Sequence, residues 1–318
     1  MRLLFYIHSL LAGGAERVTA TLANFWAGQG WSVTVVTVTG RERDFYTLDE
    51  RIKRIALKLD AESATPSATP RQAIINNWRR VRALRRMLRQ EKPDVAVAMM
   101  ATANVTLALA GWGLPVKTIG SERIHPPTFP QGRAWEVMRR LSYPRLNALV
   151  AQTRQSAEWL KLNAPAPYIE VIANPLHYPL SFHEPRVTPA DFLDVTGCAH
   201  LLLAVGRLDQ QKGFGRLLAA FAAIGENHQD WSLIILGEGR QRKSLEEQAC
   251  ALGIEHRVRF PGAVGNVGEW YDAADVYVLT SRFEGFPNTL VEALAYGVPA
   301  VAVDCETGPR EILRHEVD

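Results

Sequence analysis

Two glutamates lie eight residues apart near the end of the chain, one in a predicted loop and one inside a predicted helix. Glu284 precedes a Gly-Phe-Pro turn at 285–287, and Glu292 falls in the second turn of the helix that follows. Carboxylates accept hydrogen bonds from hydroxyl groups, so the pair can hold the hydroxyls of two sugar rings. A capped helix with solvated acids would explain either glutamate alone, but not easily both around this turn.

The start of that helix, together with a second loop, could bind a diphosphate. A helix N-terminus offers free N–H groups and positive potential, and a glycine at 285 lets the backbone approach a ligand closely. Arg207 and Lys212 follow the predicted strand 201–205 in a loop flanked by glycines. Fixed cations of this kind stabilise the charge that develops on a diphosphate leaving group. Arg207 on its own could equally be a surface cation.

These motifs, taken in order, resemble those of the retaining GT-B glycosyltransferases of family 4. EGFPNTLVE contains the paired glutamates of that family, and GRLDQQKGF (206–214) resembles its donor-phosphate motif. GEGR (237–240), RFPGAV (259–264) and GPREIL (308–313) keep the family's order, and GGAERV (13–18) resembles its glycine-rich acceptor-side loop. The resemblance implies an α/β protein with two Rossmann-like parallel-sheet domains facing a cleft, and a transfer that retains the anomeric configuration.

The resemblance also implies a role for each matched residue. Arg207 and Lys212 would bind the donor diphosphate, and Glu284 would lie near the donor sugar, so that these three are the predicted catalytic residues. Glu292 would accept hydrogen bonds from the ribose. The remaining predicted donor-binding residues are Gly206, Gly237, Gly239, Ala263, Val264, Gly285, Phe286, Pro287, Asn288 and Thr289. Gly13 and Gly14 are assigned to the acceptor side.

The segment that follows the predicted strand 116–120 departs from the family pattern. Many members have a histidine near this place that contacts the donor sugar, whereas here Arg123 occupies that slot and His125 comes two residues later. His125 is therefore a candidate catalytic residue, and the alternative is a structural loop histidine before two prolines. We assign Glu122 and Arg123 to the acceptor side.

Cofactor and metal motifs are missing from the sequence. No Asp-X-Asp motif occurs, and three cysteines lie far apart, so we expect neither a catalytic metal, a resident cofactor nor a disulfide framework. The substrate would be a nucleotide sugar, UDP-linked by our prediction. No GxGxxG follows the first strand, which disfavours a nicotinamide-dependent oxidoreductase. The alternative function is a non-catalytic nucleotide- or lipid-binding scaffold of a membrane assembly complex.

Predicted strands and helices, which must position these residues, alternate along the 318 residues of the chain. Predicted strands are 3–7, 32–39, 95–98, 116–120, 148–151, 170–172, 201–205, 233–236, 258–260, 276–279 and 300–303, and predicted helices are 15–29, 74–90, 214 onward, 241–252, 267–273 and 288–296. Nearly all-apolar strands separated by helices predict parallel sheets covered on both faces. We expect an N-terminal domain over 1–175, a proline-containing linker over 176–198 and a nucleotide-sugar-binding domain over 199–318.

Two segments allow a second interpretation. Residues 1–14 resemble a secretory signal, but polar residues interrupt the run, which favours a first strand. Residues 95–116 carry no formal charge and have the length of a membrane span, but six polar, glycine or proline residues favour a strand and a short buried helix. Residues 61–70 form a predicted loop.

The resemblance further implies that the chain stops early, with a frayed end and an incomplete second domain.

Charge divides the chain into two parts. Residues 1–175 contain 24 Lys and Arg against 13 Asp and Glu, a net +11, and residues 176–318 have a net −8. Helix 74–90 holds six arginines, with Trp78, Val81, Leu84 and Leu88 on another face. This pattern predicts binding to an anionic membrane surface or a lipid diphosphate, although a solvated face is an alternative. No nucleic-acid motif is present, so we expect no nucleic-acid partner.

The N-terminal run from Gly13, the Ser-Glu-Arg segment and residues 139–153 resemble one subgroup of the family most closely. That subgroup extends polyprenyl-diphosphate-linked oligosaccharides or builds exopolysaccharides. The resemblance implies a lipid-linked saccharide acceptor and a peripheral location on the cytoplasmic, inner face of the membrane.

Overall fold

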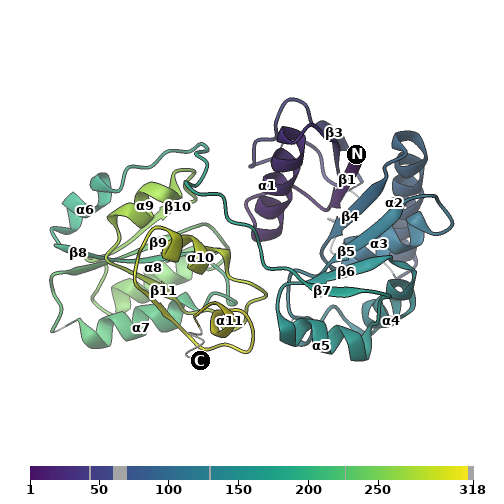
Figure 1. Cartoon of the computed structure of the whole chain (residues 1–318). Helices are drawn as coiled ribbons and strands as arrows, with labels where there is room; N and C mark the ends of the chain where they lie inside the picture. The colour runs from purple at the N-terminus through teal and green to yellow at the C-terminus, as the bar shows by residue number, and fades with distance from the viewer. Residues whose placement is uncertain (43, 60–69, 129, 226, 314–318) are drawn as a thin grey trace, which may run out of the picture. The chain divides into compact units, whose positions relative to one another are not determined.

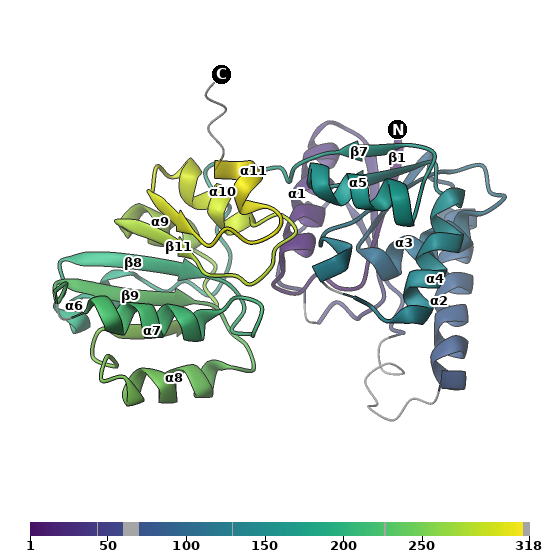
Figure 2. The same ribbon diagram turned by 90° about the horizontal axis from the view of Figure 1, so that it is seen from below.

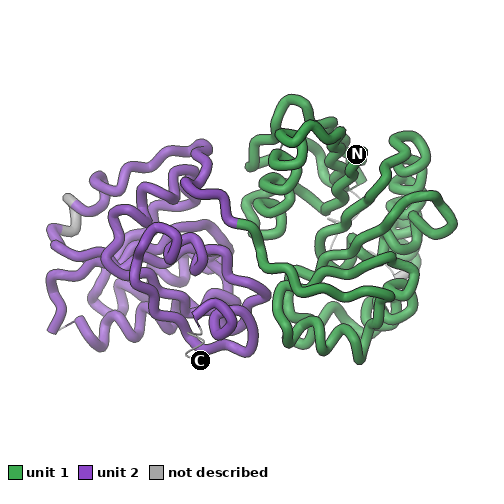
Figure 3. The backbone as a smooth tube through the Cα atoms, in the orientation of Figure 1, with its two compact units in different colours: residues 1–175 green, residues 176–318 purple. Residues whose placement is uncertain are grey.

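The computed structural model describes residues 1–42, 44–59, 70–128, 130–225 and 227–313 (Figure 1). The chain divides into two compact units, Met1–Pro175 and Leu176–Asp318 (Figure 3). Each unit contains one parallel β-sheet with helices packed on both faces. Each is therefore a doubly wound, Rossmann-like domain, which confirms the predicted fold class.

The sheet of the first unit has the strand order β3-β2-β1-β4-β5-β6-β7. Its described elements are β1 (Arg2–Ile7), α1 (Gly14–Gly28), β2 (Ser32–Thr37), β3 (Lys53–Ala56), α2 (Pro70–Glu91), β4 (Val95–Met99), α3 (Ala101–Gly111), β5 (Lys117–Ser121), η1 (Pro126–Thr128), α4 (Arg133–Ser142), η2 (Tyr143–Arg145), β6 (Ala148–Ala151), α5 (Arg154–Asn163) and β7 (Ile169–Val171). The strand order reverses between β1 and β4, and ligands of such sheets bind beside the reversal at the carboxyl ends of the strands.

Alternation along β1 explains how this sheet is buried on both faces. Leu3, Phe5 and Ile7 pack with α1, whereas Leu4 and Tyr6 pack with α2 and α3. The two views show α1 on the opposite side of the sheet from α2 and α3 (Figure 2). A strand that is covered on both faces needs apolar residues on both faces, as positions 3–7 of β1 provide.

The sheet of the second unit has the order β10-β9-β8-β11-β12. Its described elements are α6 (Ala190–Thr196), β8 (His200–Val205), α7 (Phe214–Ile224), β9 (Trp231–Leu236), α8 (Arg242–Ala251), β10 (Val258–Gly262), α9 (Val267–Ala273), β11 (Val276–Leu279), α10 (Asn288–Ala295), β12 (Ala300–Ala302) and α11 (Pro309–Leu313). Helices α7 and α8 cover one face, and α9 and α10 cover the other. The order reverses between β8 and β11, which places the loops after these two strands beside each other.

Several segments differ from the sequence prediction or fall outside it, and helices α4, α5, α6 and α11 were not predicted. Strand β3 was not predicted, because Lys53–Ala56 has only four residues and two of them are charged. Helix α2 begins at Pro70, four residues before the predicted start. The predicted loop at 61–70 lies outside the described residues except for Pro70, which begins helix α2 instead, and the predicted frayed end of the chain also lies outside them.

The predicted linker at 176–198 packs onto the second sheet and contains α6. Leu180, Val187 and Phe192 contact the apolar cluster beneath α9 and α10. The backbone of Val187 also exchanges two hydrogen bonds with the Asn266 side chain, at 3.0 and 2.9 Å. Prolines fit such an irregular strap because they cannot donate to a sheet. The segment therefore belongs to the second unit and is not a free connection.

The uncharged segment 95–116 forms strand β4 and the 11-residue helix α3. Eight residues of α3 are buried, including Asn104. No helix in the part of the chain that the structure describes is long and apolar enough to cross a bilayer.

Candidate functional site

Residues from the loops after β8 and β11 meet at the carboxyl edge of the second sheet. Lys212 Nζ lies 2.7 Å from Glu284 Oε1, and the two side chains are only 16% and 7% exposed. Ser281 Oγ donates to the same carboxylate oxygen at 2.5 Å. No hydrogen bond within the described residues engages Glu284 Oε2. The carboxylate is therefore fixed through one oxygen, and the other can accept a hydrogen bond from a ligand.

Backbone hydrogen bonds hold these two loops together. Arg282 N donates to Gln211 O at 2.7 Å, and the Gln211 amide donates to Phe283 O at 3.1 Å. Thr280 Oγ1 donates to the carbonyl of Lys212 at 2.9 Å. Since the contacts run in both directions, the lysine and the glutamate are held as one preorganised group.

Glycines allow the loops after β8 and β9 to touch. A Cβ at Gly237, where φ is +135°, would lie 2.0 Å from Gly206 O, and a Cβ at Gly239 would lie 2.3 Å from Leu208 O. Both distances are far below van der Waals contact. Gly237 and Gly239, predicted as donor-binding residues, are therefore required by the packing of the site itself.

Arg207 lies in the same loop as Lys212 but has a different environment. Its side chain is 67% exposed, and its Nε lies 3.6 Å from Asp209 Oδ2. An exposed pair of this kind contributes little to stability. The structure therefore brings Lys212 and Glu284 together and leaves the Arg207 guanidinium at the surface of the loop.

Helix α10 presents its N-terminus next to Glu284 in the chain and buries Glu292. Pro287 precedes the helix, and no side chain caps it, so its first N–H groups remain the positive end of the helix dipole. Glu292 is 1% exposed, and Tyr271 Oη donates to its Oε2 at 3.1 Å. Tyr277 Oη donates to Thr289 Oγ1 at 2.7 Å. The predicted donor residues 285–289 form the loop before this helix and its first two residues.

Ala263 and Val264 are separated from Lys212 by the width of two strands. They follow β10, the outermost strand on that side of the described sheet, and Val264 packs partly against the apolar core. Gly265, the next residue, donates to Pro185 O at 2.7 Å. The structure thus ties this predicted donor segment to the strap at 176–198.

The glycine-rich loop of the first unit leads from β1 into α1. Gly13 is the N-cap residue and has an extended backbone, with φ −156°. Tyr46 Oη donates to its carbonyl at 3.1 Å, and Ser9 Oγ donates to Glu16 Oε1 at 3.3 Å. Gly13 and Gly14 therefore lie at the carboxyl edge of the first sheet, beside the reversal of strand order.

His125 is enclosed within the first unit. It is 2% exposed, and its Nδ1 lies 3.0 Å from Ser156 Oγ, which also accepts a hydrogen bond from Thr153 Oγ1 at 2.7 Å. These contacts tie the η1 turn to α5. The geometry supports the structural alternative for His125, because its ring already has a buried partner in the protein.

Glu122 anchors a buried polar network at the carboxyl end of β5. Arg139 Nε lies 3.2 Å from Glu122 Oε1, and Tyr143 Oη donates to the same oxygen. Asn104 Nδ2 donates to Tyr143 Oη at 3.3 Å. Burial raises the pKa of Glu122, while the Arg139 charge opposes that rise. Sequence reasoning missed Arg139, Tyr143 and Asn104, because they lie 17 or more positions from Glu122, on α4, η2 and α3.

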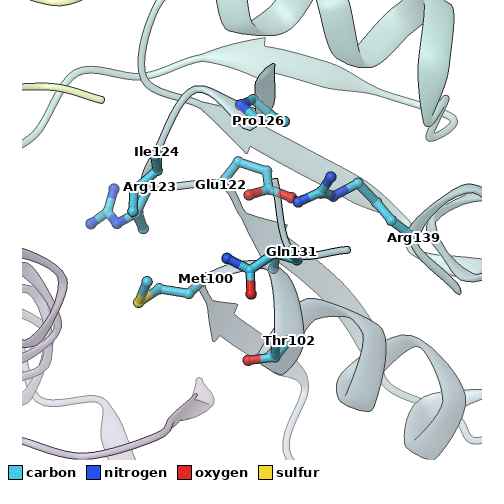
Figure 4. Close-up of a pocket in the computed structure, with 9 residues that line it drawn as sticks. Met100, Thr102, Glu122, Arg123, Ile124, Pro126, Gln131 and Arg139 are labelled. Carbon is cyan, nitrogen blue, oxygen red and sulfur yellow. Dashed lines mark ion pairs between the residues drawn. The ribbon is translucent and has the colours of Figure 1, made fainter. Parts of the chain in front are cut away.

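Arg123 points away from this network. Figure 4 shows its guanidinium on the side of the pocket opposite Arg139. Its Nη1 donates to Asn174 Oδ1 at 2.9 Å, and burial lowers its pKa to about 10. Glu122 and Arg123 are neighbours in the chain, but Glu122 contacts Arg139 and Tyr143 whereas Arg123 contacts Asn174.

The described residues contain no cluster of three or more His, Cys, Asp or Glu that could hold a metal ion. Cys198, Cys250 and Cys305 are free thiols.

Comparisons with known proteins agree with this geometry. Residues 13–175 match the glycosyl transferase 4-like domain, and residues 198–318 match the glycosyl transferases group 1 family. A Campylobacter jejuni α-1,4-N-acetyl-D-galactosaminyltransferase, named for a GalNAc-GalNAc-diNAcBac-PP-undecaprenol substrate, is 28% identical over this whole chain and 83% of its own length. The amylovoran biosynthesis glycosyltransferase AmsD of Erwinia amylovora is 27% identical over 96% of this chain and 81% of its own.

Solved structures show the same fold. Anabaena HepE, solved with UDP and glucose, superposes with a TM-score of 0.74 at 21% identity, over 99% of this chain and 83% of its own. The domain pair, the order of the motifs and the family match identify the chain as a GT-B glycosyltransferase that belongs to the glycosyl transferase 4-like family.

Proposed function

We propose that this glycosyltransferase moves a hexose or N-acetylhexosamine from a UDP-sugar to a polyprenyl-diphosphate-linked or other glycan acceptor, with retention at the anomeric carbon. The observation that carries the proposal is the buried Lys212–Glu284 pair, 2.7 Å apart at the reversal of the second sheet. HepE, with UDP and glucose bound, supports a UDP-linked donor, and the undecaprenol-linked substrate in the name of the C. jejuni relative supports a lipid-linked acceptor.

In this proposal Lys212 and Arg207 bind the diphosphate of the donor, and Glu284 and Glu292 bind its sugar and its ribose. Lys212 has three N–H donors, so it can keep Glu284 and still reach a phosphate oxygen. Arg207, exposed on the same loop, closes on the diphosphate and neutralises the charge released when the glycosidic bond breaks. The uncapped start of α10 adds backbone donors. Since cations of the protein supply this stabilisation, the reaction needs no divalent metal or resident cofactor.

The glutamates orient the two rings of the donor. Glu284 Oε2 accepts a hydrogen bond from a hydroxyl of the transferred sugar, while Ser281 and Lys212 hold Oε1. Glu292 accepts from the ribose, with Tyr271 fixing its Oε2. The acceptor hydroxyl then attacks the anomeric carbon from the face that the diphosphate leaves, through an oxocarbenium-like transition state. Its proton passes to the departing phosphate oxygen.

We further propose that α2 places the enzyme on the cytoplasmic face of an anionic membrane. Val81, Leu84 and Leu88 are buried as expected, but Trp78 is 61% exposed and does not join the core. Ile74 is 62% exposed one turn earlier, and Arg82 and Arg86 continue the same exposed stripe. Apolar and cationic residues on one face favour an anionic lipid surface over free solvent.

A transfer assay tests the function. Radiolabelled UDP-sugars are offered with a polyprenyl-diphosphate-linked N-acetylhexosamine, and the wild-type chain is compared with Lys212→Ala and Glu284→Gln. We expect transfer from at least one donor and a loss of about 100-fold or more in each variant, because each removes a charged contact to the transition state. Lys243→Ala, which removes an 89%-exposed lysine of the same unit, is the matched control. Transfer that survives both site variants unchanged rejects the proposal.

A further inference from the structure

Helix α4 carries an apolar stripe on the outside of the first unit. Val137, Met138 and Leu141 are 56%, 36% and 59% exposed, and Ala134 is exposed as well. These four positions are spaced i, i+3, i+4 and i+7, so they line one face of the helix. Single exposed apolar residues are common, but a continuous apolar face in solvent indicates an interaction surface.

The inward side of α4 holds polar residues instead. Arg139 and Ser142 are 3% and 1% exposed, and Arg139 Nε lies 3.2 Å from Glu122 Oε1. A surface helix of a globular domain normally turns its apolar stripe toward the core. Rotation of α4 to bury the stripe would break the contact between Arg139 and Glu122. The buried network therefore holds the apolar face of α4 outward.

Trp112, which follows α3, adds an exposed aromatic ring near the end of α4. It is 64% exposed, and the guanidinium carbon of Arg145 lies 4.8 Å from its ring centroid. Arg145 belongs to η2, directly after α4, and Arg85 Nη1 on α2 donates to the Trp112 carbonyl at 2.8 Å. Figure 2 shows α4 next to α3, which packs against both α2 and α4. A tryptophan paired with an arginine suits the boundary between lipid and water.

Arginines border the apolar face of α4. Arg133 and Arg140 are exposed and seven residues apart, so they lie along the same side of the helix. No hydrogen bond or ion pair within the described residues engages either side chain. Glu136, the one acidic residue of α4, is already bound by Arg139 Nη1 at 2.5 Å. The face therefore combines apolar side chains with positive charge that α4 itself does not neutralise.

This combination fits an anionic bilayer better than a second copy of the chain. In a two-fold symmetric contact the same residues of both copies meet, so the arginines that border the stripe would face one another without acidic partners. Anionic headgroups supply the missing negative charge, and the acyl chains beneath them accept the apolar side chains. A basic amphipathic helix of this kind lies in the membrane interface.

We infer that the outward face of α4, together with Trp112, inserts into the surface of an anionic bilayer. Val137, Met138 and Leu141 enter the acyl boundary, and Arg133 and Arg140 bind headgroups. The inference rests on the proposed membrane location and adds to it a second contact, separate from the stripe on α2, that depends on apolar insertion as well as on charge.

Binding to vesicles that contain no acceptor tests this contact without requiring turnover. Val137→Ser combined with Leu141→Ser removes two apolar residues from the stripe and leaves Arg140 and the buried network unchanged. We expect the affinity for vesicles that contain phosphatidylserine, measured by co-sedimentation, to fall about 10-fold or more, because both side chains lose apolar burial. Ile224→Ser combined with Leu252→Ser removes two exposed apolar residues of the second unit and should change the affinity less than about 2-fold.

Salt separates insertion from charge on this helix. Arg140→Glu should weaken binding about 10-fold or more at low salt, and this effect should nearly vanish at 1 M ionic strength, where the Debye length is about 3 Å. The effect of the double serine variant should persist, because burial of apolar surface is not screened. All of these residues are exposed, so thermal unfolding of the variants should match that of the wild type.

Three results would overturn the inference. The first is wild-type affinity in the double serine variant, and the second is a wild-type chain that does not bind the vesicles. The third is a dimer that forms without vesicles and dissociates in the double serine variant, because the face would then join two copies of the chain; sedimentation equilibrium detects it. If Arg82→Glu has no effect, only the contact through α2 fails, and if no sugar is transferred, only the proposed function fails. The vesicle comparison on α4 decides the inference in either case.

Discussion

At the scale of single residues, the proposed function depends on Glu284, whose carboxylate is held through one oxygen. Glu284 could be predicted from its spacing to Glu292, because the signature is local. Lys212 could be predicted as a cation in a glycine-flanked loop, although its 2.7 Å contact with Glu284 spans 72 positions and follows only from the fold. The burial of His125 beside Ser156 was not predictable, since its partner is 31 residues away on α5.

Ser281 is a positioning residue whose removal should affect turnover more than binding. Its hydroxyl donates to Glu284 Oε1 at 2.5 Å within a buried site, so Ser281→Ala leaves the carboxylate held by Lys212 alone. We expect kcat to fall about 10-fold, in line with a hydrogen bond to a charged group, and KM for the UDP-sugar to change less than 3-fold. Steady-state kinetics over a range of donor concentrations measure both.

Ser281→Thr, which keeps the hydroxyl, is the control and should restore most of kcat. Equal kcat in the alanine variant and the wild type would show that Lys212 alone positions the carboxylate. A change in KM without a change in kcat would also contradict the positioning role.

At the scale of elements, parallel strands bring together residues that the sequence separates. Helix α3 supplies Asn104, helix α4 supplies Arg139 and η2 supplies Tyr143 to the network around Glu122, which follows strand β5. The strands themselves were predictable from apolar β-branched runs, whereas β3, with Lys53 and Arg54 among its four residues, was not. The strap at 176–198 looked like a linker because of its prolines, and only its contacts with the core reveal that it belongs to the second unit.

The network around Glu122 should make stability depend on pH in a defined direction. Burial raises the pKa of Glu122 above its unfolded value of about 4.3. The folded state therefore holds the proton more tightly than the unfolded state, and this contribution is fully present below pH 4.3 and is lost as the pH rises through the folded pKa. Glu122→Gln cannot titrate, so it lacks this dependence.

We expect the free energy of unfolding of the wild type, minus that of Glu122→Gln, to fall as the pH rises above about 4.3, the unfolded pKa of a glutamate. Urea unfolding of both proteins at a series of pH values measures this difference. Glu158→Gln, at an exposed position, should give a difference that changes little with pH. A Glu122 difference that stays constant or grows with pH would contradict the effect of burial.

At the scale of the whole molecule, the two units differ in net charge, +11 against −8. The basic first unit contains α2, whose exposed stripe includes Ile74, Trp78 and Arg82. The difference in net charge could be counted from the sequence alone. The exposure of Trp78 could not be predicted, because Trp78 continues the helical spacing of the buried Val81, Leu84 and Leu88.

Reversal of one charge in the stripe should weaken membrane binding. A basic residue near an anionic surface contributes about 1 kcal/mol, so Arg82→Glu should lower the affinity for vesicles that contain phosphatidylserine about 10-fold or more. Vesicle co-sedimentation measures this affinity. Lys243→Glu on α8 reverses the charge of an exposed residue of the acidic unit and should change it less than 2-fold.

Salt provides an independent check. At 1 M ionic strength the Debye length is about 3 Å, so the difference between Arg82→Glu and the wild type should nearly vanish. Binding that is insensitive to both the substitution and the salt would contradict an electrostatic role for α2.

The central claim is that Lys212 and Glu284 divide the donor between diphosphate and sugar, and calorimetry with UDP and a UDP-sugar tests it most directly. Lys212→Ala should weaken both ligands by a similar factor of about 10 or more, because both carry the diphosphate. Glu284→Gln should remove the additional affinity that the sugar provides and leave UDP binding at or above the wild-type level. Equal losses of UDP and UDP-sugar in Glu284→Gln, or wild-type affinity for UDP in Lys212→Ala, would contradict the account.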